Sequence, residues 1–392
     1  MHRLVVLLLL LLLSASITQA SDTSRKRLPP PPSSSHLRFM GMYDSGFSTA
    51  QCPHQNCGPT AGGRRPFFGG SDPALDGWTN FAMSTAQDAV WARRHAPGGG
   101  PTHQLLQLSD VFFNTSVALP RAVLYPDWQQ RWAALRPLAS TLLGNRTIRG
   151  FFFGDELVGG AGLRLQSLSW AVEAVRRDFA HAPDIILYEN EAAHVFLWRP
   201  SDGRRDQPPE HWANFTHWPT GLTHVSVDIY HFLPQGHAPV ACGPGFNCSS
   251  ACVPTPSTEA WSSRVAGLHC AGAVEAFYRE QLYPRMAPHQ RALIAPGAFG
   301  GLGFPACNGS CFDAMMETDA REFYAWARAD ERGAGFVPWH FFNESSTGAP
   351  SQVPCLVRLE GLPRTLATWT EIGRNVLDQQ PCNHKTLVPL AC

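Results

Sequence analysis

The sequence predicts one (β/α)8 barrel, the TIM-barrel fold, with disulfide-stapled loops at the C-terminal ends of its strands. Short apolar runs alternate with longer stretches of helical periodicity, which is the pattern of βαβ units and a parallel sheet. Eight such runs occur, the number that closes this barrel. The chain of 392 residues shows no internal repeat and no linker beyond its N-terminal region, and barrels of this length form single domains.

The predicted strands are short and apolar, and turn residues or charges bound them. They comprise residues 38–44, 78–84, 104–110, 148–156, 184–190, 224–231, 291–298 and 335–342. The second of these is the least regular. A doubly wound open sheet, which also alternates strands with helices, is the main alternative.

Four helices are predicted between the strands, because apolar residues recur there at three- and four-residue spacing. They span 127–143, 165–179, 273–282 and 318–332. In the first of them, for example, Trp128, Trp132 and Leu135 share one face.

The N-terminal region predicts export. An apolar run from Leu4 to Leu13 follows a weakly basic start, and small residues lead to Ala20, so residues 1–20 are predicted to be a cleaved signal peptide. A membrane anchor is the alternative, but spanning takes roughly 20 apolar residues, so we expect none. Residues 21–36, rich in proline and serine, are a predicted disordered lead-in. Residues 37–392 form the predicted catalytic domain, ending in a cysteine-containing tail.

Composition agrees with a secreted, extracellular glycoprotein. Thirty-one basic residues balance 31 acidic ones, so no net field favours nucleic acid as a partner. Six Asn-x-Ser/Thr sequons predict N-glycans on surface loops. They lie at Asn114, Asn145, Asn214, Asn247, Asn308 and Asn343.

Eleven cysteines are ordinary in an oxidising compartment and predict a disulfide framework. We expect local bridges Cys52–Cys57 and Cys307–Cys311, with two further bridges in a cluster of four. That cluster is Cys242, Cys248, Cys252 and Cys270. Zinc binding is the alternative use of the cluster. Because eleven is odd, at least one thiol is free or pairs between chains, and the sequence leaves the oligomeric state open.

Carboxylates and aromatic residues gather where the predicted strands end, which is where barrel enzymes build their sites. The catalytic candidates are Glu156, Asp228, Asp155 and Glu189, and the substrate-binding candidates are Tyr43, Asp44, Tyr230, His231 and Trp339. Such a set suits sugar chemistry, because one carboxylic acid can protonate a leaving oxygen while a carboxylate attacks or activates water. Capping of the following helix, or pairing with Arg164, is the structural alternative for either acid of the pair Asp155–Glu156.

The segment Phe151-Phe152-Phe153-Gly154-Asp155-Glu156 resembles the fourth strand of TIM-barrel glycoside hydrolases. That strand carries the proton-donating glutamate at its tip. Val227-Asp228-Ile229-Tyr230 and Pro338-Trp339 are similar to elements of the sixth and eighth strands in such families. The resemblance implies that Glu156 is the general acid/base.

The sequence departs from that superfamily at the seventh predicted strand. Many retaining members carry a nucleophilic glutamate there, whereas this strand ends in Ala295-Pro296-Gly297. The second carboxylate must then come from elsewhere, and Asp228 is preferred over Glu189. Asp155 would orient Glu156 or steer an acetamido group of the substrate.

The sequence therefore predicts a secreted glycoside hydrolase with a carbohydrate substrate. A non-catalytic carbohydrate-binding protein on the same barrel is the alternative, since fold alone does not separate the two. A hydrolase of another ester or amide is the third, although no Gly-x-Ser-x-Gly elbow occurs. Without a His-x-His or His-Glu-x-x-His pattern or a phosphate loop, we expect no metal and no cofactor.

Overall fold

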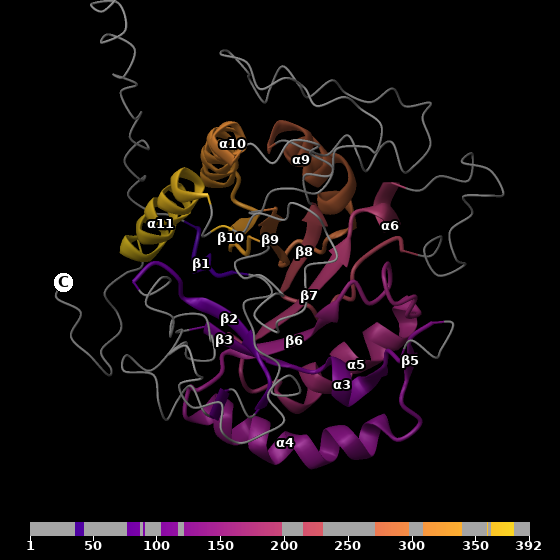
Figure 1. Ribbon diagram of the computed structural model, residues 1–392. Helices are drawn as coiled ribbons and strands as arrows, with labels where there is room; N and C mark the ends of the chain where they lie inside the picture. The colour runs from indigo at the N-terminus through magenta and orange to yellow at the C-terminus, as the bar shows by residue number, and fades with distance from the viewer. Residues whose placement is uncertain are drawn as a thin grey trace, which may run out of the picture. The chain divides into compact units, whose positions relative to one another are not determined.

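A computed structural model describes residues 36–42, 77–86, 89–90, 103–116, 121–197, 215–229, 271–297, 309–338, 359 and 362–379. Eight parallel strands form one sheet in the order β1-β10-β9-β8-β7-β6-β3-β2 (Figure 1). Their bounds are Phe39–Met40 (β1), Phe81–Ser84 (β2), His103–Gln107 (β3), Gly150–Asp155 (β6), Ile186–Ala192 (β7), His224–Ile229 (β8), Arg291–Pro296 (β9) and Gly333–Phe336 (β10). Each predicted strand overlaps one of these.

The sheet comes back on itself to make a nearly closed barrel. A parallel bridge from Gly41 to Phe81 joins the first strand to the second. The buried Asn80 holds this seam: its side chain accepts a hydrogen bond from Met40 N (2.9 Å) and donates one to Arg38 O (2.8 Å). The strand order never reverses as it does in a doubly wound sheet, so the barrel prediction is confirmed at the level of topology.

Helices connect the strands on the outside of the sheet, as crossover connections require. They are α3 (Ser109–Phe112), α4 (Trp128–Gly144), α5 (Leu165–Asp178), α6 (His194–Leu197), α9 (Ala271–Phe277), α10 (Gly309–Ala329) and α11 (Pro363–Asp378). A π-helical turn (Tyr278–Leu282) and a 3₁₀ turn (Tyr283–Arg285) extend α9, and β4 (Phe113–Asn114) pairs antiparallel with β5 (Val123–Leu124). Among the described residues, no helix is long and apolar enough to cross a bilayer.

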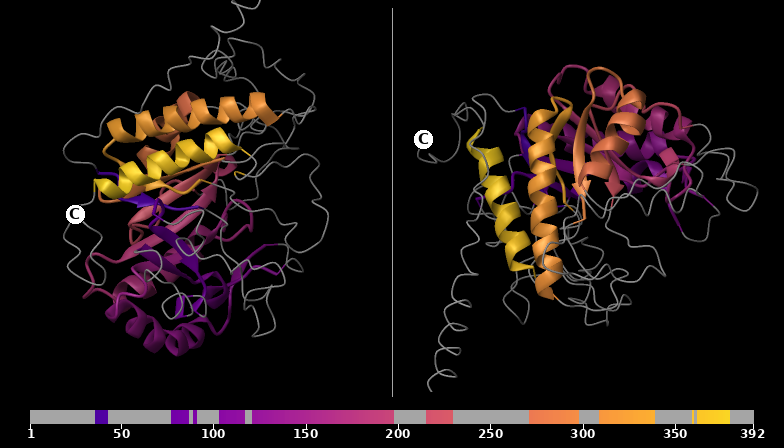
Figure 2. Two further views of the ribbon diagram at one scale, coloured as in Figure 1. Left: turned by 60° about the vertical axis from the view of Figure 1, so that its left-hand side comes forward. Right: turned by 90° about the horizontal axis from the view of Figure 1, so that it is seen from above.

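Two differences from the predicted helices stand out. Helix α10 begins nine residues before the predicted start at position 318. Helix α11 was not predicted at all, and it packs beside α10 (Figure 2). The buried carboxylate of Asp313 accepts hydrogen bonds from the N–H groups of Arg364 and Thr365, both at 2.9 Å, so α10 supplies the N-terminal cap that α11 lacks in its own sequence.

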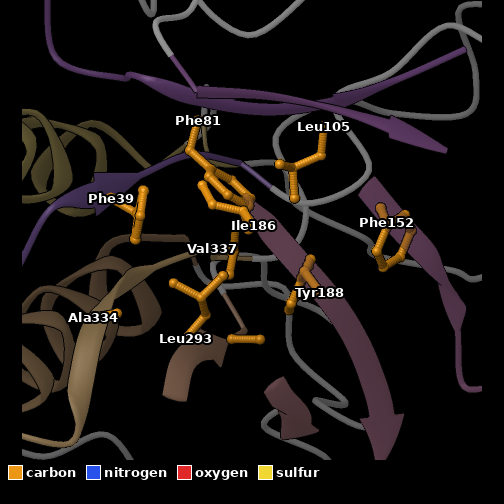
Figure 3. Close-up of a cluster of buried hydrophobic side chains, with 10 residues drawn as sticks. Phe39, Phe81, Leu105, Phe152, Ile186, Tyr188, Leu293, Ala334 and Val337 are labelled. Atoms are coloured by element: carbon orange, nitrogen blue, oxygen red, sulfur yellow. The ribbon is translucent and has the colours of Figure 1, made fainter. Parts of the chain in front are cut away.

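The barrel interior is filled by inward-facing side chains from all around the sheet (Figure 3). The stacked rings of Phe152 and Tyr188 have centroids 5.2 Å apart, and Phe81 meets Tyr188 edge-on at 5.9 Å. Since side chains alternate along a strand, Ile186 and Tyr188 establish which face of β7 points inward. Outward-facing Phe151 packs against Trp132 and Phe179 under the helices.

One close approach in this barrel gives a stability prediction. Gly150 pairs with Ile186, and a Cβ at position 150 would overlap the carbonyl oxygen of Ile186. We expect Gly150→Ala to lower the free energy of unfolding by about 3 kcal/mol, because β6 would have to move away from β7. Gly144→Ala is the matched control, since nothing lies within 4 Å of a Cβ there. Equal denaturation midpoints for the two variants would contradict this reading of the β6–β7 contact.

Candidate active site at the C-terminal ends of the strands

Three neighbouring strands bring polar residues together at the C-terminal end of the barrel. Asp155 of β6 pairs with Asn190 of β7, which in turn pairs with Ser226 of β8. One step further along, Ala192 pairs with Asp228. The inward face of β7 carries Tyr188, so Asn190, Ser226 and Asp228 lie on the inward side as well.

A β-bulge turns Asp155 to that side. From Phe152 to Asp155 strand β6 advances three residues, whereas β7 advances only two, from Tyr188 to Asn190. An extra residue in one strand reverses the alternation beyond it. Without the bulge Asp155 would face outward with Phe151 and Phe153.

A chain of hydrogen bonds runs from the barrel interior to this carboxylate. Tyr188 Oη lies 2.7 Å from Ser226 Oγ, Ser226 donates to Asn190 Oδ1, and Asn190 Nδ2 donates to Asp155 Oδ1 at 2.8 Å. Tyr188, Asn190 and Ser226 are fully buried, while Asp155 is exposed. Burial raises the pKa of Tyr188 well above its ordinary value, so the phenol stays protonated. The network fixes the orientation of Asp155 at the rim.

Glu156 occupies a strained turn directly after β6. Its φ of 46° lies in the left-handed region, which costs a non-glycine residue about 1 kcal/mol. Hydrogen bonds hold it there: its N–H donates to Asn190 O (2.9 Å), and its carbonyl accepts from Gly160 and Ala161. Such strain clusters at functional sites.

The carboxyl group of Glu156 lies against the backbone of Gly160, where a Cβ would come within 2.7 Å of Glu156 Oε2. Burial, followed by the charge of Asp155, raises its pKa from 4.5 to about 7. A glutamate in this environment holds its proton near neutral pH, whereas the neighbouring Asp155 is exposed to solvent. Two adjacent carboxyl groups in such different environments can take separate roles as acid and base.

Asp228 is 6% exposed and is the last inward-facing residue of β8. Its register partners are Ala192 on β7 and Ala295 on β9. Both of these neighbours are small, and both oxygens of the Asp228 carboxylate are buried. Its charge contributes to the raised pKa of Tyr188 and Tyr278.

Glu189 lies on the other face of β7, away from Tyr188 and Asn190, because side chains alternate. It is fully buried next to the equally buried Glu191, whose oxygens accept hydrogen bonds from Val158 N (2.6 Å) and Gly159 N (2.8 Å). Burial and the neighbouring carboxylate raise the pKa of Glu189 well above its usual range, and burial raises that of Glu191 to about 8. Both carboxyls lie on the outer face of β7, so Glu189 does not reach the mouth where Asp228 stands.

Several predicted residues lie outside the part of the chain that the structure describes. They are the binding candidates Tyr43, Asp44, Tyr230, His231 and Trp339, together with the cysteine side chains of the predicted bridges. Within the described ranges, no cluster of three or more His, Cys, Asp or Glu side chains is arranged to hold a metal ion. Strand β9 ends in Ala295-Pro296, so the carboxylates of the site come from β6 and β8.

Comparison with known proteins reveals only distant resemblance. No family model and no curated protein matches the chain. A GH2 beta-galacturonidase from Eisenbergiella tayi, solved with galacturonate, is 12% identical with a TM-score of 0.38, covering 77% of this chain and 46% of that one. The Legionella pneumophila ChiA C-terminal domain is 11% identical with a TM-score of 0.33, covering 80% and 95%. This chain thus spans less than half of the galacturonidase, and similarity this weak carries no argument about activity.

Proposed function

We propose that this protein is a secreted glycoside hydrolase. The observation that carries the proposal is Glu156: a carboxyl group with its pKa raised to about 7, in a strained turn at the C-terminal end of a barrel strand, beside Asp155. General acid catalysis needs a group that is protonated near the working pH. Glycosidic bond cleavage uses such an acid together with a second carboxylate.

In this proposal Glu156 protonates the leaving oxygen of the scissile bond. Asp228 is the second carboxylate, because it faces inward from β8 beside two alanines. Asp155, held by Asn190, keeps a negative charge next to Glu156 and so favours the protonated form of the acid. Glu189 has no part in the reaction, because it lies on the outer face of β7.

Export and glycosylation belong to the same proposal. The leader-like residues 1–20 and the six sequons support it. Of the sequons in the described part of the chain, Asn145 is exposed at the end of α4, where its Oδ1 accepts a hydrogen bond from the Thr147 hydroxyl at 2.6 Å. A surface turn of this kind is accessible to glycan attachment.

A non-catalytic carbohydrate-binding protein is the second candidate. The absence of an acid at the end of β9 favours it, since Asp228 must otherwise replace the nucleophile that many retaining barrels carry there. Both candidates use the same mouth of the barrel, and they differ only in turnover.

The test is to secrete the wild-type protein from a eukaryotic host and incubate it with a panel of oligosaccharides, including uronic acid and N-acetylhexosamine polymers. Released products are measured by mass spectrometry, and binding is measured in parallel on the same glycans. We expect at least one glycan to be both bound and cleaved. Binding without cleavage would favour the second candidate, and neither binding nor cleavage would contradict both.

A further inference from the structure

The N-terminal end of the barrel, opposite the candidate active site, carries a cavity of about 890 Å³. That volume is within the range of small-molecule pockets. Three arginines line it, Arg38, Arg149 and Arg291, and so do the imidazoles of His103 and His224. They come from the beginnings of five different strands, so the fold brings together residues that are far apart in the sequence.

The innermost part of this cavity is the lowest layer of the barrel interior. Arg291 is the register partner of His224 and faces inward with it, and His103 precedes inward-facing Leu105 by two residues. The ring of Phe39 contacts both imidazoles edge-on, with centroids 5.0 Å from His103 and 5.2 Å from His224. Barrel layers are usually filled by bulky aliphatic side chains, whereas this one carries a guanidinium and two imidazoles.

Two of the arginines that line the cavity have no acidic partner within the described ranges. Neither Arg149 nor Arg291 forms an ion pair with any acidic residue in the described part of the chain. The carboxylates of Asp184 and Glu331 also line the cavity, and both are exposed, as are Arg38 and Arg291. The two acidic residues precede strands β7 and β10 by two residues, whereas Arg291 is the first residue of β9, so they lie nearer the rim than His224 and Arg291 do.

The protonation state of His224 is consistent with the cationic groups around it. Burial and the charges of Arg291, His103 and Arg38 lower its pKa to about 3, so the imidazole is neutral and its charged surroundings are cationic. Its Nδ1 lies 2.9 Å from Thr223 Oγ1. Its Nε2 has no hydrogen-bond partner among the described residues, and the ring lines the cavity.

We propose that this cavity binds a tetrahedral oxyanion, namely the sulfate or phosphate group of a small ligand. Guanidinium groups match such anions with paired N–H donors, and Arg291 with Arg149 supplies them from two sides of the barrel. The volume exceeds what a bare anion needs, so a sugar ester of the anion also fits. The site lies at the other end of the barrel from Glu156, so the proposal does not depend on the proposed hydrolase activity.

Calorimetric titration at constant ionic strength in sodium chloride tests this site. The probes are inorganic sulfate, inorganic phosphate, glucose 6-sulfate and glucose 6-phosphate, with glucose as the uncharged control. We expect one anion per chain to bind, and Arg291→Gln to weaken binding at least about tenfold, as the loss of a charge-assisted contact should. Tighter binding of the inorganic anions would identify a free ion as the ligand, and tighter binding of the esters an esterified sugar.

Two further variants keep the test decisive. Arg149→Gln removes a guanidinium from the other side of the barrel and should weaken binding several-fold even if Arg291→Gln does not fold. Arg176→Gln, at an exposed position on α5 outside the cavity, should bind as the wild type does. Absence of binding by the wild type, or equal affinity in the wild type and the folded cavity variants, would overturn the proposal.

Discussion

Replacement of Glu156 by glutamine is expected to reduce turnover of any glycan substrate by at least about 100-fold, the usual scale for loss of a positioned general acid. Glutamine has nearly the same shape but no transferable proton. It fits against Gly160 as the glutamate does, and it removes a partly buried carboxyl group whose ionisation is unfavourable. Folding and glycan binding should therefore be retained, which separates a loss of chemistry from a loss of structure.

The pH dependence of the wild-type reaction gives an independent measurement. Because Glu156 must be protonated to act as the acid, kcat/KM should fall as the pH rises through about 7, the pKa of this carboxyl in the folded protein. Asp155→Asn removes the neighbouring negative charge, the second cause of the raised pKa. The basic limb of the profile should then move to lower pH.

Glu322→Gln is the matched control for this experiment. Glu322 is a partly buried glutamate on α10 whose pKa is also raised, mainly by burial, but it lies within the helix layer and not at a strand end. Its replacement should leave turnover unchanged. Full activity of Glu156→Gln on a substrate that the wild type cleaves would refute the proposed mechanism.

The free energy of unfolding is expected to fall as the pH rises above about 6.5, by about 2 kcal/mol over about 1.5 pH units for Glu191, and the raised pKa of Glu189 acts in the same direction. Both carboxyls have a raised pKa in the folded chain, and that of Glu191 is about 8 against an ordinary 4.5. Their stabilising contribution is complete below the unfolded pKa and is lost as the pH rises through the folded pKa. Between these values the folded chain holds protons that the unfolded chain has released.

The ionisation of His224 has an opposite effect on the free energy of unfolding, but it acts mainly at lower pH. Its pKa is lowered to about 3, so its contribution is present above about 6.5, the ordinary pKa of histidine, and is lost as the pH falls toward 3. Above about pH 6.5 the imidazole is largely neutral in both states and adds little slope. Glu156, with a pKa of about 7, adds a smaller decrease at the lower end of the window.

Chemical denaturation of Glu189→Gln at several pH values isolates the contribution of the Glu189–Glu191 pair to the pH dependence of stability. The amide is neutral at every pH and can donate a hydrogen bond to the Glu191 carboxylate, so the variant should be more stable than the wild type at pH 8 and should show a shallower slope. Glu173→Gln, at an exposed position on α5, should leave the slope as it is. An unchanged slope in Glu189→Gln would show that this carboxyl ionises normally in the folded chain.

The strands of the barrel could be predicted from local sequence patterns. Parallel strands that are buried on both faces need continuous apolar runs, and segments such as Phe151–Phe153 and Ala292–Ala295 display them locally. The same local pattern shows carboxylates directly after the apolar runs, so Asp155, Glu156 and Asp228 could be identified as candidates. By contrast, α11 escaped prediction, because its buried face includes Thr365, Thr368 and Gly373 among the apolar residues and so weakens the periodicity.

Which of these residues face one another depends on strand pairing and could not be predicted from local patterns. Glu189 and Asn190 are adjacent in the sequence, but the register of β7 places Asn190 inward with Tyr188 and Glu189 outward with Glu191. The bulge in β6 reverses the expected direction of Asp155, and such a bulge depends on pairing between strands and not on local propensity. The cationic layer around His224 and Arg291 likewise arises because closing the barrel aligns the beginnings of distant strands, a relation that no sequence spacing records.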